Sequence, residues 1–198
     1  MMPDNAINIL VGIVLVVTLA ANFSAARKGF KQTVTKYEFK PKTFLQQIPP
    51  NVAAFILILE VLGVFQIGTV ESSESITYFY IRVVGLVVFA IFSYVQVQAH
   101  KNLGSNYSQE IAIVKGHQLV KNKSYRLIRH PQYLSQVLSD LGAGVALAGF
   151  IILPLVILVE LPLFLLRARR EDKLLENHFG DEWLEYKKKS GFIIPFIG

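Results

Sequence analysis

The sequence predicts an all-α integral membrane protein with five transmembrane helices, a cytoplasmic connecting loop and C-terminal helices. The last two spans are expected to form a helical hairpin. The 198 residues are 53% hydrophobic with a mean hydropathy of +0.44, too apolar for an ordinary soluble domain. The apolar residues form long blocks rather than a helical or alternating pattern, and the basic residues cluster between these blocks.

The first three apolar blocks each predict one membrane-spanning helix. Residues 6–26 are uncharged, residues 52–70 contain only Glu60 as a charged residue, and residues 76–99 contain only Arg82. A helix needs about 20 predominantly apolar residues to cross the hydrocarbon core of a bilayer. Each block is therefore long enough for a single crossing.

The fourth apolar block, residues 133–166, is too long for one crossing and slightly short for two. We expect a tight or thinly spanning helical hairpin with its turn near residues 149–154. Small residues recur at spacings of four and three along its first helix, which favours close packing against another helix. These residues are Ser135, Ser139, Gly142, Ala146 and Gly149.

The distribution of charge predicts the membrane topology. Of the 20 Lys and Arg residues, six lie in residues 27–42, six in 101–129 and seven in 167–189. The segments predicted on the opposite side carry acidic residues and no basic ones, namely Asp4, Glu71 and Glu74. The positive-inside rule then places the N-terminus outside and the three basic segments in the cytoplasm. The net charge of +6 is explained by topology, and we expect no nucleic-acid partner.

We expect a single membrane domain over residues 1–198. Residues 1–99 hold three spans and an interfacial arm, and residues 100–198 hold a catalytic half. The arm, residues 29–51, interleaves aromatic and basic residues, which is typical of a segment in the headgroup layer; a lid over a lipid entrance is the alternative. Residues 102–129 form a long polar connection, and connections of this length are often functional.

Polar side chains gather where the hairpin meets the predicted cytoplasmic surface. Pro131 favours an extended His130 and suits a first helical turn, which places His130 and Tyr133 at that surface. Arg167 and Glu171 lie one helical turn apart on the continuation of the last helix. The site is therefore predicted beside a route into lipid.

These residue types suit a sulfonium methyl donor, which carries an amino group, a carboxylate, an adenine and a positive sulfur. Glu171 can bind the ammonium group, and the turn at residues 117–120 can offer backbone contacts. Arg167 can hold an anionic acceptor through a bidentate pair. Walls, hydrogen bonds and cation–π contact with the sulfonium can come from Tyr125, His130 and Tyr133.

The class of acceptor decides what catalysis requires. A carboxylate is already ionised at neutral pH and needs no general base, and a dry cavity should accelerate its methylation because charge cancels in the step. An amine acceptor would have to lose a proton, for which His130 or Glu171 are the candidates. The candidate catalytic residues are Arg167, Glu171 and His130. The chain has no cysteine, which excludes disulfides and thiolate metal sites, and we expect no metal.

Five motifs follow one another along the second half of the chain. They are His117-Gln118-Leu119-Val120, Tyr125, Arg129-His130-Pro131-Gln132-Tyr133, Arg167 with Glu171, and Phe179-Gly180-Asp181-Glu182 followed by Tyr186. Together they resemble the isoprenylcysteine carboxyl methyltransferase family. Each motif alone is weak, but their order and spacing across a membrane hairpin are specific. The similarity covers residues 102–198, whereas the first two spans share only general character.

The resemblance implies S-adenosylmethionine as the cofactor, a lipid or prenylated acceptor that enters from the bilayer, and Arg167 as the holder of the substrate carboxylate. It implies cofactor contacts at His117, Gln118, Leu119, Val120, Tyr125, His130, Pro131, Gln132, Tyr133 and Glu171. Lys123-Ser124 departs from the family, which often has a glycine before the tyrosine. Short relatives methylate other acceptors, so a phospholipid amine or a small thiol is an alternative to the isoprenylcysteine carboxyl group.

Other interpretations compete with this one. The arginines alone suit headgroup anchors, and Glu171 alone suits an ion pair with Arg167, but neither explains the order of the motifs. A membrane reductase of the sterol-reductase type, using a nicotinamide cofactor, shares the His-Pro-x-Tyr pattern but has an asparagine where Gln132 stands. A non-enzymatic membrane scaffold or transporter subunit would leave the motifs unexplained.

Four charged residues fall inside the predicted spans: Glu60, Arg82, Asp140 and Glu160. Intramembrane carboxylates are functional candidates, although a hydrogen-bonded helix–helix contact is an equally good interpretation. Glu60 and Arg82 are a candidate ion pair.

Overall fold

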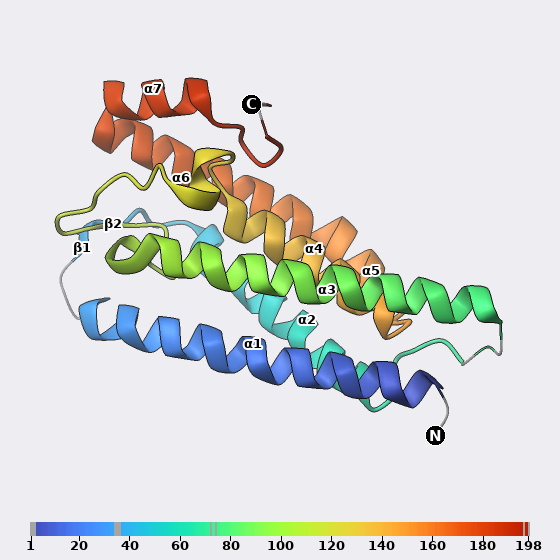
Figure 1. Ribbon diagram of the computed structural model, residues 1–198. Coiled ribbons are helices and arrows are strands. Elements are labelled where there is room, and N and C mark those ends of the chain that lie inside the picture. The colour runs from blue at the N-terminus through green and yellow to red at the C-terminus, as the bar shows by residue number, and fades with distance from the viewer. Residues whose placement is uncertain (1–2, 34–36, 72, 74, 196, 198) are drawn as a thin grey trace.

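The computed structural model describes residues 3–33, 37–71, 73, 75–195 and 197 of the chain. Residues 34–36 of the predicted interfacial arm and Glu74 lie outside this described part. The described chain is a bundle of helices with one two-stranded sheet (Figure 1). The helices are α1 (Pro3–Thr33), α2 (Ile48–Val64), α3 (Ile76–Leu103), α4 (Pro131–Ala146), α5 (Ile152–Leu155), α6 (Leu161–Phe179) and α7 (Asp181–Lys189).

In the described part of the chain, three helices are long and apolar enough to cross a membrane. The candidate spans are Asn5–Phe23, Phe44–Val64 and Ile76–Leu103, which agree with the three single spans predicted from the sequence. Large apolar side chains on these helices face outward, for example Val16 at 67% exposure and Tyr94 at 66%. Such a surface is expected of helices that contact lipid.

Helix α2 begins earlier than the apolar block suggests. The interfacial arm was predicted to extend to residue 51, but the helix starts at Ile48, with Pro49 in its first turn. Proline is favourable there because the first N–H groups of a helix have no partner within the helix. The prolines therefore begin the span instead of separating it from the arm.

The predicted hairpin is formed by α4 and a continuous helix from residue 152 to residue 179. This second helix comprises α5, a π-helical turn η4 (Val156–Glu160) and α6. The connection, residues 147–151, overlaps the turn predicted at residues 149–154. At this connection Ala148 O accepts a hydrogen bond from Val70 N (2.9 Å), so it meets the α2–α3 loop. We call this end of the bundle the turn end.

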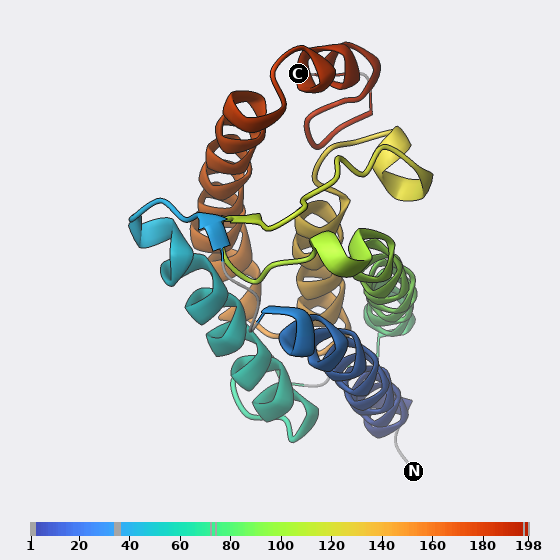
Figure 2. The ribbon, with the colours of Figure 1, turned by 90° about the vertical axis from the view of Figure 1, so that its left-hand side faces the viewer.

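The small-residue stripe on α4 packs against α3, as predicted. A Cβ atom on Gly142 would lie 2.5 Å from the backbone nitrogen of Phe89, and one on Gly85 would lie 2.6 Å from that of Ala146. The hydroxyl oxygens of Ser93 and Ser139 are 2.9 Å apart across the same interface. Viewed along the bundle, α4 lies between α3 and α6 (Figure 2). It is thus well placed to connect groups from several helices.

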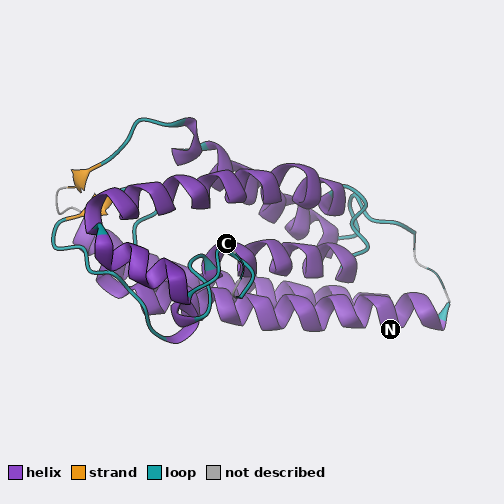
Figure 3. Cartoon of the chain, turned by 90° about the horizontal axis from the view of Figure 1, so that it is seen from above, coloured by secondary structure: helices purple, strands orange, loops and turns teal. Residues whose placement is uncertain are grey.

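The opposite end of the bundle, the site end, carries the irregular segments. Strand β1 (Tyr37–Phe39) pairs antiparallel with β2 (Ile113–Val114), which joins the α1–α2 connection to the α3–α4 connection. Both strands lie at this end of the bundle (Figure 3). Helix α6 ends at Phe179, the following Gly180 has a φ of +54° that suits glycine, and the chain turns back into α7. The site end therefore gathers the α3–α4 connection, α6 and α7.

Candidate active site

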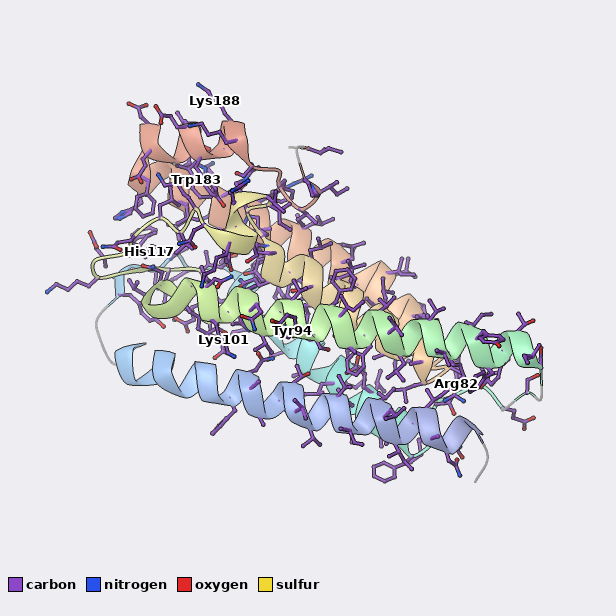
Figure 4. The ribbon with its side chains drawn as sticks, viewed as in Figure 1. Arg82, Tyr94, Lys101, His117, Trp183 and Lys188 are labelled. Carbon is purple, nitrogen blue, oxygen red and sulfur yellow. The ribbon has the colours of Figure 1, made fainter. Side chains whose placement is uncertain are left out.

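A cavity of about 100 Å³ lies at the site end, between the α3–α4 connection and α6. Its polar lining includes His117, Tyr125, His130, Gln132 and Glu171, all of which were predicted from the sequence. Leu174 and Leu175 supply an apolar wall on α6. Figure 4 shows His117 at this end, on the same side as Trp183 and far from Arg82 at the turn end.

Three polar atoms of uncharged groups in the lining are buried without a hydrogen-bond partner among the described residues. They are Nδ1 of His117, the hydroxyl of Tyr125 and Oε1 of Gln132. An unsatisfied buried polar group costs about 1–3 kcal/mol, so three around one cavity mark a place for a polar ligand. Such a ligand could form hydrogen bonds with the ring nitrogen of His117, the phenol of Tyr125 and the amide oxygen of Gln132.

Glu171 is held by two of the residues predicted to act with it. Its Oε1 accepts hydrogen bonds from the Tyr133 hydroxyl (2.5 Å) and from Arg167 Nε (3.3 Å), and Arg167 Nε also donates to the Tyr133 oxygen (2.8 Å). Its Oε2 lies 3.8 Å from His130 Nδ1. Because Glu171 lines the cavity, this network presents a fixed carboxylate to it.

The remaining nitrogens of Arg167 bond to backbone carbonyls from two connections. Nη1 donates to Leu45 O (3.0 Å) and Nη2 donates to Gln109 O (2.6 Å). Gln46 strengthens the same junction, because its side-chain amide both accepts from Ile111 N (2.8 Å) and donates to Ile111 O (3.0 Å). Arg167 thus ties α6 to the α1–α2 and α3–α4 connections.

Asp172 organises the other side of His130 and was not predicted from the sequence. Its Oδ1 accepts from His130 Nε2 (2.6 Å) and its Oδ2 accepts from Arg129 Nε (3.1 Å). Arg129 Nη1 also donates to Ser190 O (2.6 Å). One signal was available: Phe164, Ala168 and Asp172 follow one another by four residues on the buried face of α6.

Helix α7 supports the segment that carries Tyr125. The Tyr186 hydroxyl donates to Tyr125 O (2.6 Å), and Trp183 is buried to 1% exposure. Residues 127–129 form a parallel bridge with Gly191, in which Arg129 N donates to Gly191 O (2.9 Å). The C-terminal segment therefore fixes one wall of the cavity.

Burial determines the protonation of two groups in the cavity. Burial and then the nearby His178 lower the pKa of His117 to about 4, so its imidazole is neutral at pH 7. Burial, with Glu171 adding to it, raises the pKa of the Tyr125 hydroxyl well above its ordinary value. Tyr125 accordingly keeps its proton and can donate, whereas neutral His117 has one donor and one acceptor nitrogen.

Several predicted residues lie beside the cavity rather than in its described lining. Tyr133 and Arg167 each donate a hydrogen bond to Glu171, and Pro131 starts α4. The backbone N–H of Gln118 donates to the side-chain oxygen of Asn106 (2.8 Å). The described lining does not include Gln118, Leu119 or Val120.

Residues 83–177 match the profile of the isoprenylcysteine carboxyl methyltransferase (ICMT) family. The predicted family resemblance is confirmed. This region begins within α3 and ends near the end of α6, so it contains the α3–α4 connection, the hairpin and Glu171.

Relatives with the name protein-S-isoprenylcysteine O-methyltransferase match between 48% and 61% of the chain. Protein-S-isoprenylcysteine O-methyltransferase of Saccharomyces cerevisiae is 33% identical over 117 residues, 58% of this chain and 49% of the yeast protein. The probable enzyme of the same name from Oryza sativa subsp. indica is 30% identical over 122 residues, 61% of this chain and 64% of the rice protein. The chain spans about half the length of the yeast relative it matches.

A solved structure of an ICMT protein has the same fold. It is described as the eukaryotic intramembrane Ras methyltransferase ICMT and matches with a TM-score of 0.56 over 75% of this chain and 52% of that chain. The sequence identity is 21%, so this likeness concerns the fold alone. The chain is therefore mostly helical with an ICMT-like membrane fold.

Proposed function

We propose that this protein transfers a methyl group from S-adenosylmethionine to a membrane-borne lipophilic acceptor, and that the acceptor is the carboxyl group of an isoprenylcysteine-type molecule. The observation that carries the proposal is the set of unpartnered polar atoms of His117, Tyr125 and Gln132 around a cavity that also exposes Glu171. A ligand with an ammonium group and several hydrogen-bonding groups fits this donor and acceptor set.

The residues of the cavity fit the donor by their chemistry. Glu171 would hold the ammonium group, while the phenol of Tyr125, the amide of Gln132 and the imidazole of His117 would bind its polar atoms. When bound, S-adenosylmethionine supplies an electrophilic methyl group on a sulfonium. The cavity of about 100 Å³ is smaller than the roughly 300 Å³ at which ligand pockets begin. We propose that the α3–α4 connection moves outward to admit the donor.

The protein's contribution to a carboxylate acceptor is orientation and exclusion of water. Arg167 is 4% exposed and offers a planar fork of five N–H groups, of which Nη1 and Nη2 each use one on a backbone carbonyl. Its remaining N–H groups, or those released from Gln109 O when the connection opens, would hold the acceptor. A dry site favours this reaction because the opposite charges of donor and acceptor cancel.

We also propose that the α4–α6 hairpin spans the membrane, which gives five spans in a single domain. Contact of Val70 with Ala148 supports this proposal, because the hairpin turn lies level with the α2–α3 loop. The basic residues are concentrated in segments of the site end, so the positive-inside rule places the site end and the C-terminus in the cytoplasm and the N-terminus outside. The donor would then enter from the cytosol and the acceptor from the bilayer.

The test uses the full chain in lipid nanodiscs with methyl-labelled S-adenosylmethionine and an N-acylated S-farnesylcysteine. We expect a base-labile label, as for a methyl ester, and none when the acceptor's carboxyl group is blocked as an amide. Arg167→Lys should reduce turnover by about tenfold or more through loss of charged hydrogen bonds, whereas the exposed Arg169→Lys should match the wild type. A base-stable label, or oxidation of NADPH in place of methyl transfer, would contradict the proposal.

A further inference from the structure

A second cavity, of about 190 Å³, lies deeper in the bundle among α1, α2, α3 and α4. We call it the acidic cavity, because its lining contains the carboxyl groups of Glu60 and Asp140. Gln136 lines it as well, one helical turn along α4 from Gln132, which lines the site-end cavity. The two cavities are therefore successive along α4, and the acidic cavity is the one farther into the predicted membrane.

The carboxyl groups of the acidic cavity are removed from water. Glu60 is 2% exposed and Asp140 is 4% exposed. Asp140 accepts hydrogen bonds from Gln136 Nε2 (2.8 and 2.7 Å), and Gln136 Oε1 accepts from Gln96. Oε1 of Glu60, by contrast, is buried with no hydrogen-bond partner among the described residues. Glu60 thus contributes an oxygen without a hydrogen-bond partner, whereas Asp140, the other carboxyl group of the lining, already accepts hydrogen bonds from Gln136.

A third carboxyl group lies close to these two. Glu160 is 1% exposed and lies within electrostatic range of both Glu60 and Asp140. It stands at the end of the π-helical turn η4, an interruption of helical geometry that often occurs at functional positions. Three carboxyl groups from three different elements therefore meet in one low-dielectric region.

The described lining offers no cation to balance them, since it contains no lysine, arginine or histidine. Arg82 was a candidate partner for Glu60, but it donates to Ala146 O (2.6 Å) and to the side-chain oxygen of Asn8 (2.5 Å) at the turn end. Ionising a buried carboxyl group without a counter-ion is costly, and a positively charged ligand would offset that cost, so a cation is the class of ligand that this site favours.

The size and walls of the cavity point to an organic cation. No group of three His, Cys, Asp or Glu residues in the described part of the chain is arranged to hold a metal ion. The volume corresponds to about six water molecules, too large for one ion with oxygen ligands at about 2.4 Å. Leu15, Leu57 and Phe89 supply apolar walls beside the carboxyl groups. An alkyl chain with a charged head matches both kinds of lining.

We propose that the acidic cavity binds the ammonium group of a membrane amphiphile, with Glu60 and Asp140 as its charged ligands. This site is separate from the donor cavity, and its occupancy does not depend on methyl transfer. A free small amine has the same head-group chemistry, so the experiment includes one.

The test measures binding to the full chain in nanodiscs by native mass spectrometry. The probes are hexadecylamine, hexadecanol, which lacks the charge, and soluble ethanolamine, which lacks the chain. We expect hexadecylamine to bind about tenfold or more tightly than hexadecanol. The double variant Glu60→Gln, Asp140→Asn should lose this preference, whereas the exposed Glu185→Gln should keep it. Equal binding of amine and alcohol, or a preference that survives in the double variant, would overturn the proposal.

A photoreactive alkylamine gives a second measurement that needs no variant. Its cross-links should map to the segments of α1–α4 that line the acidic cavity. An excess of hexadecylamine should reduce the yield of these cross-links, whereas an excess of hexadecanol should not. Cross-links confined to the outer faces of the helices would overturn the proposal. Competition by ethanolamine as strong as that by hexadecylamine would overturn the assignment to a membrane amphiphile.

Discussion

His130 Nε2 and Asp172 Oδ1 are 2.6 Å apart, and this contact joins the first turn of α4 to the middle of α6. The other oxygen of Asp172 bonds to Arg129, so one carboxylate holds two consecutive residues that border the cavity. The hydrogen bond fixes the His130 ring with Nδ1 directed toward Glu171. Asp172 thus sets the position of a predicted site residue without lining the site-end cavity.

Replacing Asp172 should therefore destabilise the protein. Asp172→Ala leaves Arg129 buried without this carboxylate, and loss of one partner of a buried ion pair costs about 3 kcal/mol or more. The free energy of unfolding can be followed by the fluorescence of the chain's one tryptophan, Trp183, during denaturing-detergent titration. Glu185→Ala on α7 is the control; equal stability of the two variants would contradict the role given to Asp172.

His117 should make stability depend on pH between about 4 and 6.5. Its pKa is about 4 in the folded state and has an ordinary value of 6.5, so the unfolded chain takes up a proton first as the pH falls. Stability should therefore be full above pH 6.5 and decline toward pH 4. Unfolding midpoints at several pH values should show a smaller decline in His117→Asn than in the wild type. If the unfolding midpoints of the two proteins declined equally with falling pH, the result would contradict a buried neutral imidazole at His117.

The close approach of α3 and α4 should make Gly142 intolerant of a side chain. A Cβ atom there would meet the backbone nitrogen of Phe89 at 2.5 Å, and overpacking of this kind costs about 1–3 kcal/mol. Gly12→Ala on α1 is the matched control, because the nearest atom, on Val64, is 3.4 Å away. The midpoint of thermal unfolding should be lower for Gly142→Ala than for Gly12→Ala. Equal midpoints would show that the α3–α4 interface is looser than described.

Tyr186 should stabilise the wall that carries Tyr125. Tyr186→Phe removes the hydroxyl that bonds to Tyr125 O and should cost about 1 kcal/mol. Tyr94→Phe is the control, since Tyr94 is 66% exposed on the outer face of α3 (Figure 4). Thermal unfolding of both variants measures the effect; an equal loss in the two would remove the support assigned to α7.

The helices could be predicted from the sequence because each depends on local composition. Apolar blocks gave the three single spans, and Pro131 marked the start of α4. The predicted arm extended to residue 51, past the start of α2 at Ile48, because the apolar block begins only at residue 52, whereas Pro49 lies in the first helical turn, where proline is favourable.

The partners of the site residues could not be predicted in the same way, because they depend on distant segments. Arg167 donates hydrogen bonds to the backbone carbonyls of Leu45 and Gln109. Because every residue has a backbone carbonyl, the residue type does not indicate which one will accept. The grouping of Glu60 with Asp140 and Glu160 depends on how three elements pack, so the pairing of Glu60 with Arg82 was an equally reasonable guess.

Titration of the full chain in nanodiscs with S-adenosylmethionine tests the proposed donor site most directly. The wild type and the exposed variant Glu185→Gln should bind it with equal affinity, and Glu171→Gln should bind it about tenfold or more weakly because a charged partner for the ammonium group is lost. Equal affinity in all three proteins, or no binding to the wild type, would contradict the account.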